Sequence, residues 1–254
     1  MKKTFSSKKS AFSLIELSIV LIIIGLLIAG VTGGASLIKS SELRSAMGEA
    51  RGYAVAVNAF YTQYNALPGD YNTSLGIPAS TTGNPYGDYD AKIEFCTTGC
   101  VTGTVTTGSE GAMAWQHLKY AGGIDTAPTF TGGATASQAA ITNYPGSKIR
   151  AAGWGFDYNS TSLQNVVVLT SSTTVAATVA VDGAGGNTLV NGTPISVGAL
   201  VPADALSIDK KIDDGIANTG KVQGILSTCF TTTAYLVSTT TKACPISYQV
   251  DVTS

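Results

Sequence analysis

Residues 12–38 decide the fold, and they read FSLIELSIVLIIIGLLIAGVTGGASLI. The 22 residues from 17 to 38 carry no charged side chain. A helix of that length would measure about 33 Å, enough to cross a hydrocarbon core of about 30 Å. Residues 1–11, which precede it, are polar and basic. Because positive flanks stay in the cytoplasm, we expect the rest of the chain on the other side of the membrane.

An ordinary cleaved signal peptide is the first alternative for this segment. The apolar core of a signal peptide commonly spans about 7–15 residues, which is shorter than the apolar run found here. The small residues between Ala29 and Ala35 could still form a cleavage site. A membrane anchor is therefore favoured by length, and the signal peptide is not excluded by composition.

Glu16 is a carboxylate at the start of the apolar run. A lone carboxylate within a membrane segment costs a few kcal/mol, so it either lies harmlessly among the headgroups or has a partner cation. If the chain were cut after Ala11, the new α-amino group of Phe12 would lie four residues before Glu16. The amine of one copy could then neutralise the carboxylate of the next in a staggered bundle of helices, which would set the axial register of an assembly.

The segment from Ala11 to Leu27 resembles the prepilin cleavage and methylation segment shared by type IV pilins and type II secretion pseudopilins. The family pattern is a basic leader, a small residue at the cut, an aromatic new N-terminus and a glutamate as fifth mature residue. Here Ala11 stands where the family usually has glycine, Phe12 would be the new N-terminus, and Glu16 is fifth. The resemblance implies that a membrane aspartic peptidase, the prepilin peptidase, cuts between Ala11 and Phe12 and methylates Phe12.

The chain is expected to be α+β, with one long N-terminal helix packed on an antiparallel sheet. Apolar residues recur at helical spacing as far as Tyr64, no proline interrupts residues 12–67, and Leu67-Pro68-Gly69-Asp70 reads as a stop. We divide the chain into a leader (1–11), a membrane or filament-core half of the helix (12–38), an amphipathic half (39–66) and a β-rich head (67–254). Pilin resemblance implies the same architecture.

Within the head, residues 71–109 are rich in turn-forming residues and read as an irregular loop. A short helix is expected over Glu110–Tyr120, and another begins at Pro202. His117, the only histidine, is expected at a surface or a helix flank. Short β-type runs follow Lys148, and their close spacing favours antiparallel pairing; they are Leu163–Thr170, Thr174–Val181, Ile195–Val201, Lys221–Ser227 and Tyr235–Thr239.

The four cysteines are Cys96, Cys100, Cys229 and Cys244. An even number in an exported head predicts two disulfides, with three possible connectivities. Local closure is the simplest and pairs Cys96 with Cys100 and Cys229 with Cys244; the second loop also resembles the C-terminal disulfide loop of many pilins. A zinc site is the alternative, but the spacing lacks the paired short knuckles that such sites use.

A carboxylate cluster follows Pro202 and includes Asp209, Asp213 and Asp214. Asp209 and Asp213 are four residues apart and would share a helix face. Several oxygens at a helix end suit Ca²⁺, and type II pseudopilins often carry a structural calcium in the head. The alternative is a solvated acidic face partly neutralised by Lys210 and Lys211.

Composition and motifs favour a structural function over catalysis. Basic and acidic residues number 15 and 16, and removing residues 1–11 with their four lysines would leave 11 against 16, a formal charge of −5. The sequence has no basic stripe of the kind that indicates nucleic-acid binding. It also shows no nucleophile paired with a general base, and no phosphate-binding loop. The expected function is a non-enzymatic subunit of a type IV pilus-like filament; the alternatives are an unpolymerised adhesive module and, less favoured, a membrane-anchored hydrolase.

The resemblance also implies partners and a location. The partners would be further copies or other pilins in a filament, the prepilin peptidase, an inner-membrane assembly platform, and the membrane before assembly. The precursor would cross the bacterial inner membrane once with its head in the periplasm. After assembly the subunit would belong to an extracellular or periplasmic filament, of either a pilus or a secretion system.

Overall fold

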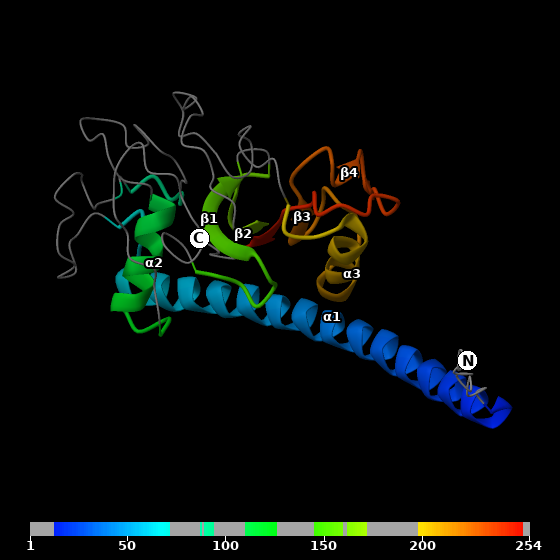
Figure 1. Cartoon of the computed structure of the whole chain (residues 1–254). Helices are drawn as coiled ribbons and strands as arrows, with labels where there is room; N and C mark the ends of the chain where they lie inside the picture. Colours follow the sequence, from blue (N-terminus) through cyan, green and yellow to red (C-terminus); the bar gives the residue numbers. More distant parts are fainter. Residues whose placement is uncertain are drawn as a thin grey trace, which may run out of the picture. The chain divides into compact units, whose positions relative to one another are not determined.

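The computed structural model describes residues 13–71, 87, 89–93, 110–125, 145–159, 162–171 and 198–250. It divides into two compact units, Met1–Glu42 and Leu43–Ser254, which are described separately here. Helix α1 (Leu14–Tyr64) contributes residues to both units. Figure 1 labels this helix and the helices and strands that follow it. The predicted disulfide between Cys96 and Cys100 lies outside the described residues, as does the predicted strand Thr174–Val181.

Helix α1 has 51 residues and is therefore about 77 Å long. It ends one turn before the Pro-Gly pair, close to the predicted boundary at residue 66. Asn65 takes a left-handed backbone conformation, with φ of 53°, and its N–H donates to the Tyr61 carbonyl at 2.8 Å. Asparagine tolerates this conformation better than most residues, so Asn65 ends the helix in the way that glycine often does.

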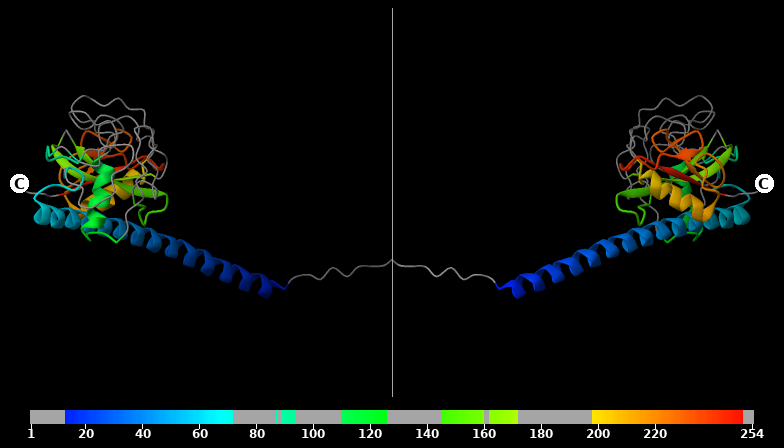
Figure 2. Two further views of the ribbon diagram at one scale, coloured as in Figure 1. Left: turned by 90° about the vertical axis from the view of Figure 1, so that its left-hand side faces the viewer. Right: turned by 90° about the vertical axis from the view of Figure 1, so that its right-hand side faces the viewer.

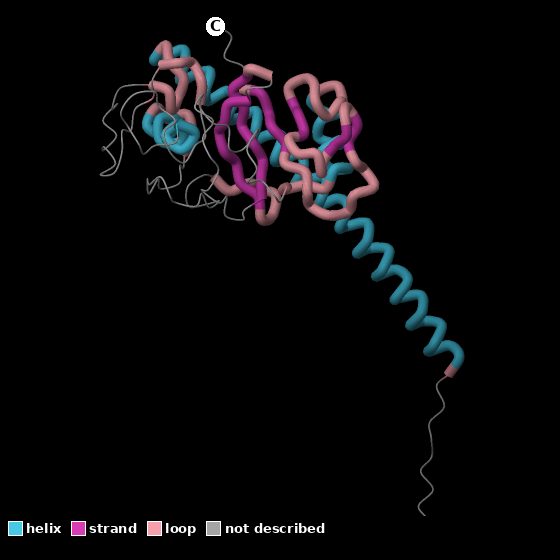
Figure 3. The backbone as a smooth tube through the Cα atoms, turned by 90° about the horizontal axis from the view of Figure 1, so that it is seen from above, coloured by secondary structure: helices cyan, strands magenta, loops and turns pink. Residues whose placement is uncertain are grey.

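The second unit contains a four-stranded antiparallel sheet in the order β1-β2-β6-β3. Figure 3 shows these strands side by side. Strands β4 and β5 form a separate two-stranded hairpin, and helices α2 and α3 complete the unit. The bounds are α2 Glu110–Tyr120, β1 Ala152–Asn159, β2 Gln164–Ser171, α3 Pro202–Ile212, β3 Val222–Gly224, β4 Phe230–Thr231, β5 Ala234–Tyr235 and β6 Ile246–Gln249.

The α+β class and the antiparallel sheet are confirmed, whereas the individual strands were predicted unevenly. Helix α2 matches its predicted bounds, and β2 and β3 fall in predicted runs. Strand β1 was missed because it is buried almost throughout and contains two glycines, so it lacks an alternating pattern. The predicted strand Tyr235–Thr239 was wrong beyond Tyr235, where the chain leaves the β4–β5 hairpin and turns.

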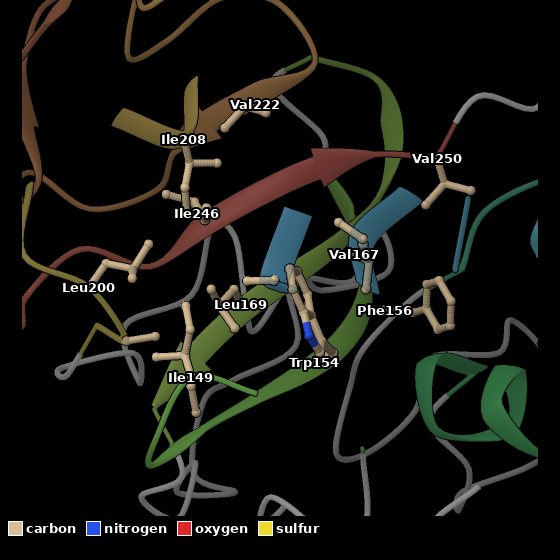
Figure 4. Packing of buried hydrophobic residues seen from close by; sticks show 14 of the residues in the cluster. Ile149, Trp154, Phe156, Val167, Leu169, Leu200, Ile208, Val222, Ile246 and Val250 are labelled. Atoms are coloured by element: carbon tan, nitrogen blue, oxygen red, sulfur yellow. The ribbon is translucent and has the colours of Figure 1, made fainter. Parts of the chain in front are cut away.

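One hydrophobic core joins the second half of α1 to the sheet. Small residues on α1, such as Ala46 and Ala50, are almost fully buried and belong to this core. Figure 2 shows from two sides that this part of α1 runs along the sheet. Figure 4 shows how buried residues of the sheet, such as Trp154, pack with Ile208 of α3 and with Leu200. Residues paired across β1 and β2 form the centre of the core: Trp154 with Leu169 and Phe156 with Val167.

Glu49 adds a polar connection to this apolar contact. It is half-buried on α1, and its carboxylate accepts hydrogen bonds from the Trp154 Nε1–H at 2.8 Å and the Ser147 hydroxyl at 2.8 Å. It also accepts the Lys148 backbone N–H at 3.0 Å. Hydrogen bonds to a charged acceptor are stronger than neutral ones, so Glu49 fixes the rotation of α1 against β1.

His117 is buried, so the expectation of a surface or helix-flank position was wrong. Its side chain is only 1% exposed and stacks on Phe60, with ring centroids 5.7 Å apart. Its Nδ1 accepts the Gly69 backbone N–H at 2.8 Å, which requires the neutral ring. Burial lowers the pKa of His117 to about 4.

Gly69 must be glycine for this contact to form. Its φ is +93°, and a Cβ built there would lie 2.4 Å from the carbonyl oxygen of Glu110. The Pro-Gly turn thus packs directly on the first turn of α2, and His117 lies about two turns further along the same helix. The turn that ends α1 and the start of α2 are therefore one tightly packed structure.

We expect Glu49→Ala to lower the free energy of unfolding by about 2–3 kcal/mol, because it leaves the Trp154 N–H without its acceptor. Glu49→Gln keeps one acceptor oxygen and should cost less. Urea unfolding of the detergent-solubilised chain, followed by tryptophan fluorescence, measures both. Glu42→Ala is the matched control, because Glu42 makes no hydrogen bond or ion pair among the described residues. Equal effects of Glu42→Ala and Glu49→Ala would contradict the role of Glu49.

The lowered pKa of His117 predicts a loss of stability in acid. The unfolded chain binds a proton near pH 6.5 and the folded chain only near pH 4, so stability falls as the pH drops through this window. The contribution of His117 should reach about 3 kcal/mol. Urea unfolding at pH 7 and pH 4.5 should show that His117→Gln removes this part of the pH dependence. Lys119→Gln, at an exposed position of the same helix, should leave the pH dependence of stability unchanged. If the free energy of unfolding of His117→Gln falls between pH 7 and pH 4.5 as much as that of the wild type, the assignment is refuted.

Candidate functional site

The first unit presents an uninterrupted apolar surface. Every Leu, Ile and Val side chain from Leu14 to Ile38 is at least 46% exposed. Among the described residues, α1 is the one helix long and apolar enough to cross a membrane, with a mean hydropathy of 2.8 in its most apolar window. Burying this much apolar surface away from water is strongly favourable, so the segment requires either lipid or other helices around it.

The polar side chains of this segment are satisfied inside the helix. The hydroxyl groups of Ser18, Thr32 and Ser36 donate to backbone carbonyls three or four residues earlier, at 2.8–3.1 Å. Glu16 accepts the backbone N–H of Ser13 at 2.9 Å. Polar groups in hydrocarbon need such internal partners, so these hydrogen bonds are compatible with a membrane interior.

The structure describes Glu16 but not the predicted cleavage bond. Ala11 and Phe12 lie outside the described residues. Glu16 is exposed in the first turn of α1, and residues 17–38 contain no other charge. An exposed carboxylate on an apolar helix can pair with a cation from another molecule. Sequence reasoning missed its contact with Ser13, although Ser13-Leu14-Ile15-Glu16 before an apolar run is a recognised capping signal.

A disulfide joins Cys229 to Cys244 in the second unit. Both cysteines are fully buried, and the loop between them contains the β4–β5 hairpin. The hairpin is attached to the rest of the unit by the Tyr235 hydroxyl, which donates to Asp209 Oδ2 at 2.9 Å. The disulfide closes the loop at its base, and the Tyr235–Asp209 hydrogen bond connects the loop to α3.

Asp209, Asp213 and Asp214 come together at the end of α3. Each offers an oxygen within 4.8 Å of the others, a spacing at which they could hold a metal ion. Asp209 is buried, and this burial raises its pKa to about 6, with the charges of Asp214 and Asp213 adding to the rise. The hard carboxylate oxygens are of the type that Ca²⁺ and Mg²⁺ prefer.

The same carboxylates already accept hydrogen bonds from the loop that follows. Asp209 Oδ1 accepts the Gly215 N–H at 3.2 Å, and Asp213 Oδ2 accepts the N–H groups of Lys221 and Val222. Asp214 accepts the Ile216 N–H at 2.8 Å and the Thr219 hydroxyl at 2.7 Å. These donors hold residues 215–222 against the three carboxylates. The donors to Asp214 also lower its pKa, the Ile216 N–H most.

The described residues give His117 no catalytic geometry. It is the only histidine of the chain, its Nδ1 is occupied by the Gly69 N–H, and its ring is stacked in the core. A general base must reach a substrate proton, which a buried ring in this position cannot do. Among the described contacts, His117 therefore serves packing and hydrogen bonding in the core.

Asp70 and Glu49 are further residues that sequence reasoning missed. Asp70 is buried beside the Pro-Gly turn, and its carboxylate accepts the N–H groups of Asp90 at 3.1 Å and Ala91 at 3.0 Å. An aspartate after Pro-Gly signals a local turn, but it does not predict these donors, which lie 20 and 21 positions downstream. Glu49 offers no comparable signal, because its partners are about 100 positions away in the sequence.

Comparison with known families identifies the N-terminal segment. Residues 6–32 match the family of the prokaryotic N-terminal methylation motif. No curated protein and no solved structure matches the chain. The match covers residues 6–11 of the basic leader, the predicted cut, Glu16 and most of the apolar run. Residues 6–32 therefore form the prepilin-type cleavage and methylation segment that type IV pilins and pseudopilins share.

Proposed function

We propose that the chain is a structural subunit of a type IV pilus-like filament, as a pilin or a pseudopilin. One observation carries this proposal: the methylation motif at residues 6–32 overlaps the first part of a helix in which, up to residue 38, every Leu, Ile and Val side chain is exposed and Glu16 is the only charge. Such a segment suits storage in a membrane followed by burial among identical helices. The motif points to a structural protein rather than an enzyme.

Processing would follow from the proposed division of the chain. The basic leader, residues 1–11, stays in the cytoplasm, and the head, residues 67–254, lies in the periplasm. Prepilin peptidase cuts between Ala11 and Phe12 and methylates the new Phe12 amine. An inner-membrane assembly platform then moves the helix from lipid into the filament. Residues 12–38 exchange lipid contacts for helix contacts, while residues 39–66 remain attached to the head.

Glu16 would set the axial register of the filament. In an apolar filament core, a carboxylate is stable only with a partner of opposite charge or with full hydrogen bonding. Residues 13–38 contain no Lys or Arg, so the trimmed Phe12 amine of a neighbouring subunit is the cation that this segment can supply. One favourable stagger places the amine beside the carboxylate, and other staggers leave both charges unpaired.

The first test is the N-terminus of the native protein. Mass spectrometry of the protein from its own cell envelope should find a chain that begins with N-methylated Phe12. Glu16→Ala should remain inserted and trimmed but fail to enter filaments, because the register pairing is lost. Glu42→Ala, a change to the next acidic residue of the same helix, should assemble normally.

An unpolymerised adhesive module on a simple anchor is the competing function. Such a module would tolerate Glu16→Ala and would need no cut at Ala11. A native protein that still begins at Met1 and functions normally would contradict the filament proposal.

The acidic cluster gives a separate test, of calcium in the head. Because Asp209, Asp213 and Asp214 already accept hydrogen bonds, we expect the melting temperature of the full chain in detergent to be unchanged by excess EDTA. A melting temperature that falls in EDTA and returns with Ca²⁺ would instead establish a structural calcium. Asp213→Asn should abolish that response, whereas Asp125→Asn, outside the cluster, should not.

A further inference from the structure

The disulfide loop of the head exposes a dense group of hydroxyls. Cys229 and Cys244 are 15 positions apart, and the residues between them include six threonines and one serine. Residues 222–241 carry no charge. Six of the seven hydroxyl residues are exposed and Thr239 is half-buried; the seven are Thr231, Thr232, Thr233, Ser238, Thr239, Thr240 and Thr241.

The side-chain hydroxyls of this loop have no hydrogen-bond partner within the part of the chain that the structure describes. Neighbouring threonines differ from them. The Thr228 hydroxyl donates to the Ala243 carbonyl at 2.8 Å, and the Thr219 hydroxyl donates to Asp214 at 2.7 Å. A hydroxyl bonded in this way is held by the fold, whereas those of the loop are available to another molecule.

Thr232 lies at the tip of the loop on an unfavourable backbone. Thr231 pairs directly with Ala234, so Thr232 and Thr233 are the two central residues of the β4–β5 hairpin. The φ of Thr232 is 56°. A two-residue hairpin turn with positive φ at its first central residue prefers glycine there, and a β-branched residue with positive φ is an outlier. A threonine at a position that glycine would fill at lower cost indicates a function outside the fold.

We propose that the tip of this hairpin is a covalent modification site, with the Thr232 hydroxyl as the main acceptor and a neutral sugar as the added group. Thr232 Oγ1 bonds to the anomeric carbon of a glycosyl phosphate donor. The bond from that carbon to the phosphate breaks, the phosphate leaves with the electron pair, and the hydroxyl proton passes to a base of the transferase. This inference goes beyond the filament function and does not depend on polymerisation.

The surroundings of the hairpin favour a neutral group over a phosphoryl group. The Tyr235 hydroxyl donates to Asp209, one of the three carboxylates at the end of α3. The Thr233 carbonyl accepts the Ala217 N–H at 2.9 Å, from the loop that follows these carboxylates. A phosphate next to aspartates is disfavoured by repulsion between like charges. A sugar adds bulk and polar groups without charge, which suits the uncharged surface of residues 222–241.

Mass spectrometry of the chain from its own cell envelope tests the site. After reduction, trypsin releases residues 222–242 as one peptide, because it cuts after the two lysines that flank the loop. Electron-transfer fragmentation should place a sugar on Thr232 and leave Thr228 of the same peptide unmodified. A peptide without a sugar, or with a sugar only on Thr239–Thr241, would overturn the inference. A phosphate at the tip would overturn the assignment of a sugar.

Variants at the tip separate modification from folding. Thr232→Gly should lose most of the sugar, Thr232→Ser should keep it, and Thr240→Ala, at an exposed position of the same loop, should match the wild type. In a host without the transferase, Thr232→Gly should melt no more than about 2 °C below the wild type, because relief of strain offsets the freedom of glycine in the unfolded chain. A larger fall would show that Thr232 serves the fold and would overturn the inference.

The same spectra distinguish this inference from the filament proposal. A chain that begins at methylated Phe12 and lacks the sugar overturns the inference and leaves the filament proposal intact. A chain that carries the sugar and functions normally while beginning at Met1 overturns the filament proposal and confirms the modification site.

Discussion

The exposed apolar surface of residues 14–38 is the constraint on which the rest of the molecule depends. Its Leu, Ile and Val side chains are exposed in the part of the chain that the structure describes, and their transfer out of water is worth far more than any single polar contact there. Lipid and other apolar helices are the two environments that would cover them. Under the proposed function, a subunit would pass from one environment to the other without refolding.

The polar groups of α1 divide the helix by function. In residues 13–38 they bond within the helix and leave the surface apolar. Further along, Glu49 bonds to the sheet, and Ala46 and Ala50 belong to the core that α1 shares with it. One continuous helix thus has a first part that any apolar neighbour can surround and a second part whose contacts are specific to this sheet.

The sequence predicted what depends on local pattern. The long helix, α2 and the start of α3 follow from periodicity and from proline and glycine at their ends, and Cys229–Cys244 is the local pairing. Contacts between distant residues could not be predicted. Glu49 meets Trp154, and Gly69 meets His117, through tertiary packing that leaves no periodic signal. Strand β1 was missed for the same reason, because burial on both faces removes its alternation.

The candidate site shows the same limit at shorter range. The importance of Glu16 follows from a single charge in an apolar run, but that reasoning treats the charge as unsatisfied and looks for its partner in another molecule. The structure supplies a partner three residues away. A carboxylate with an internal partner is more stable in the single chain. In the proposed filament, assembly would therefore release less free energy than the pairing with a neighbouring amine alone would provide.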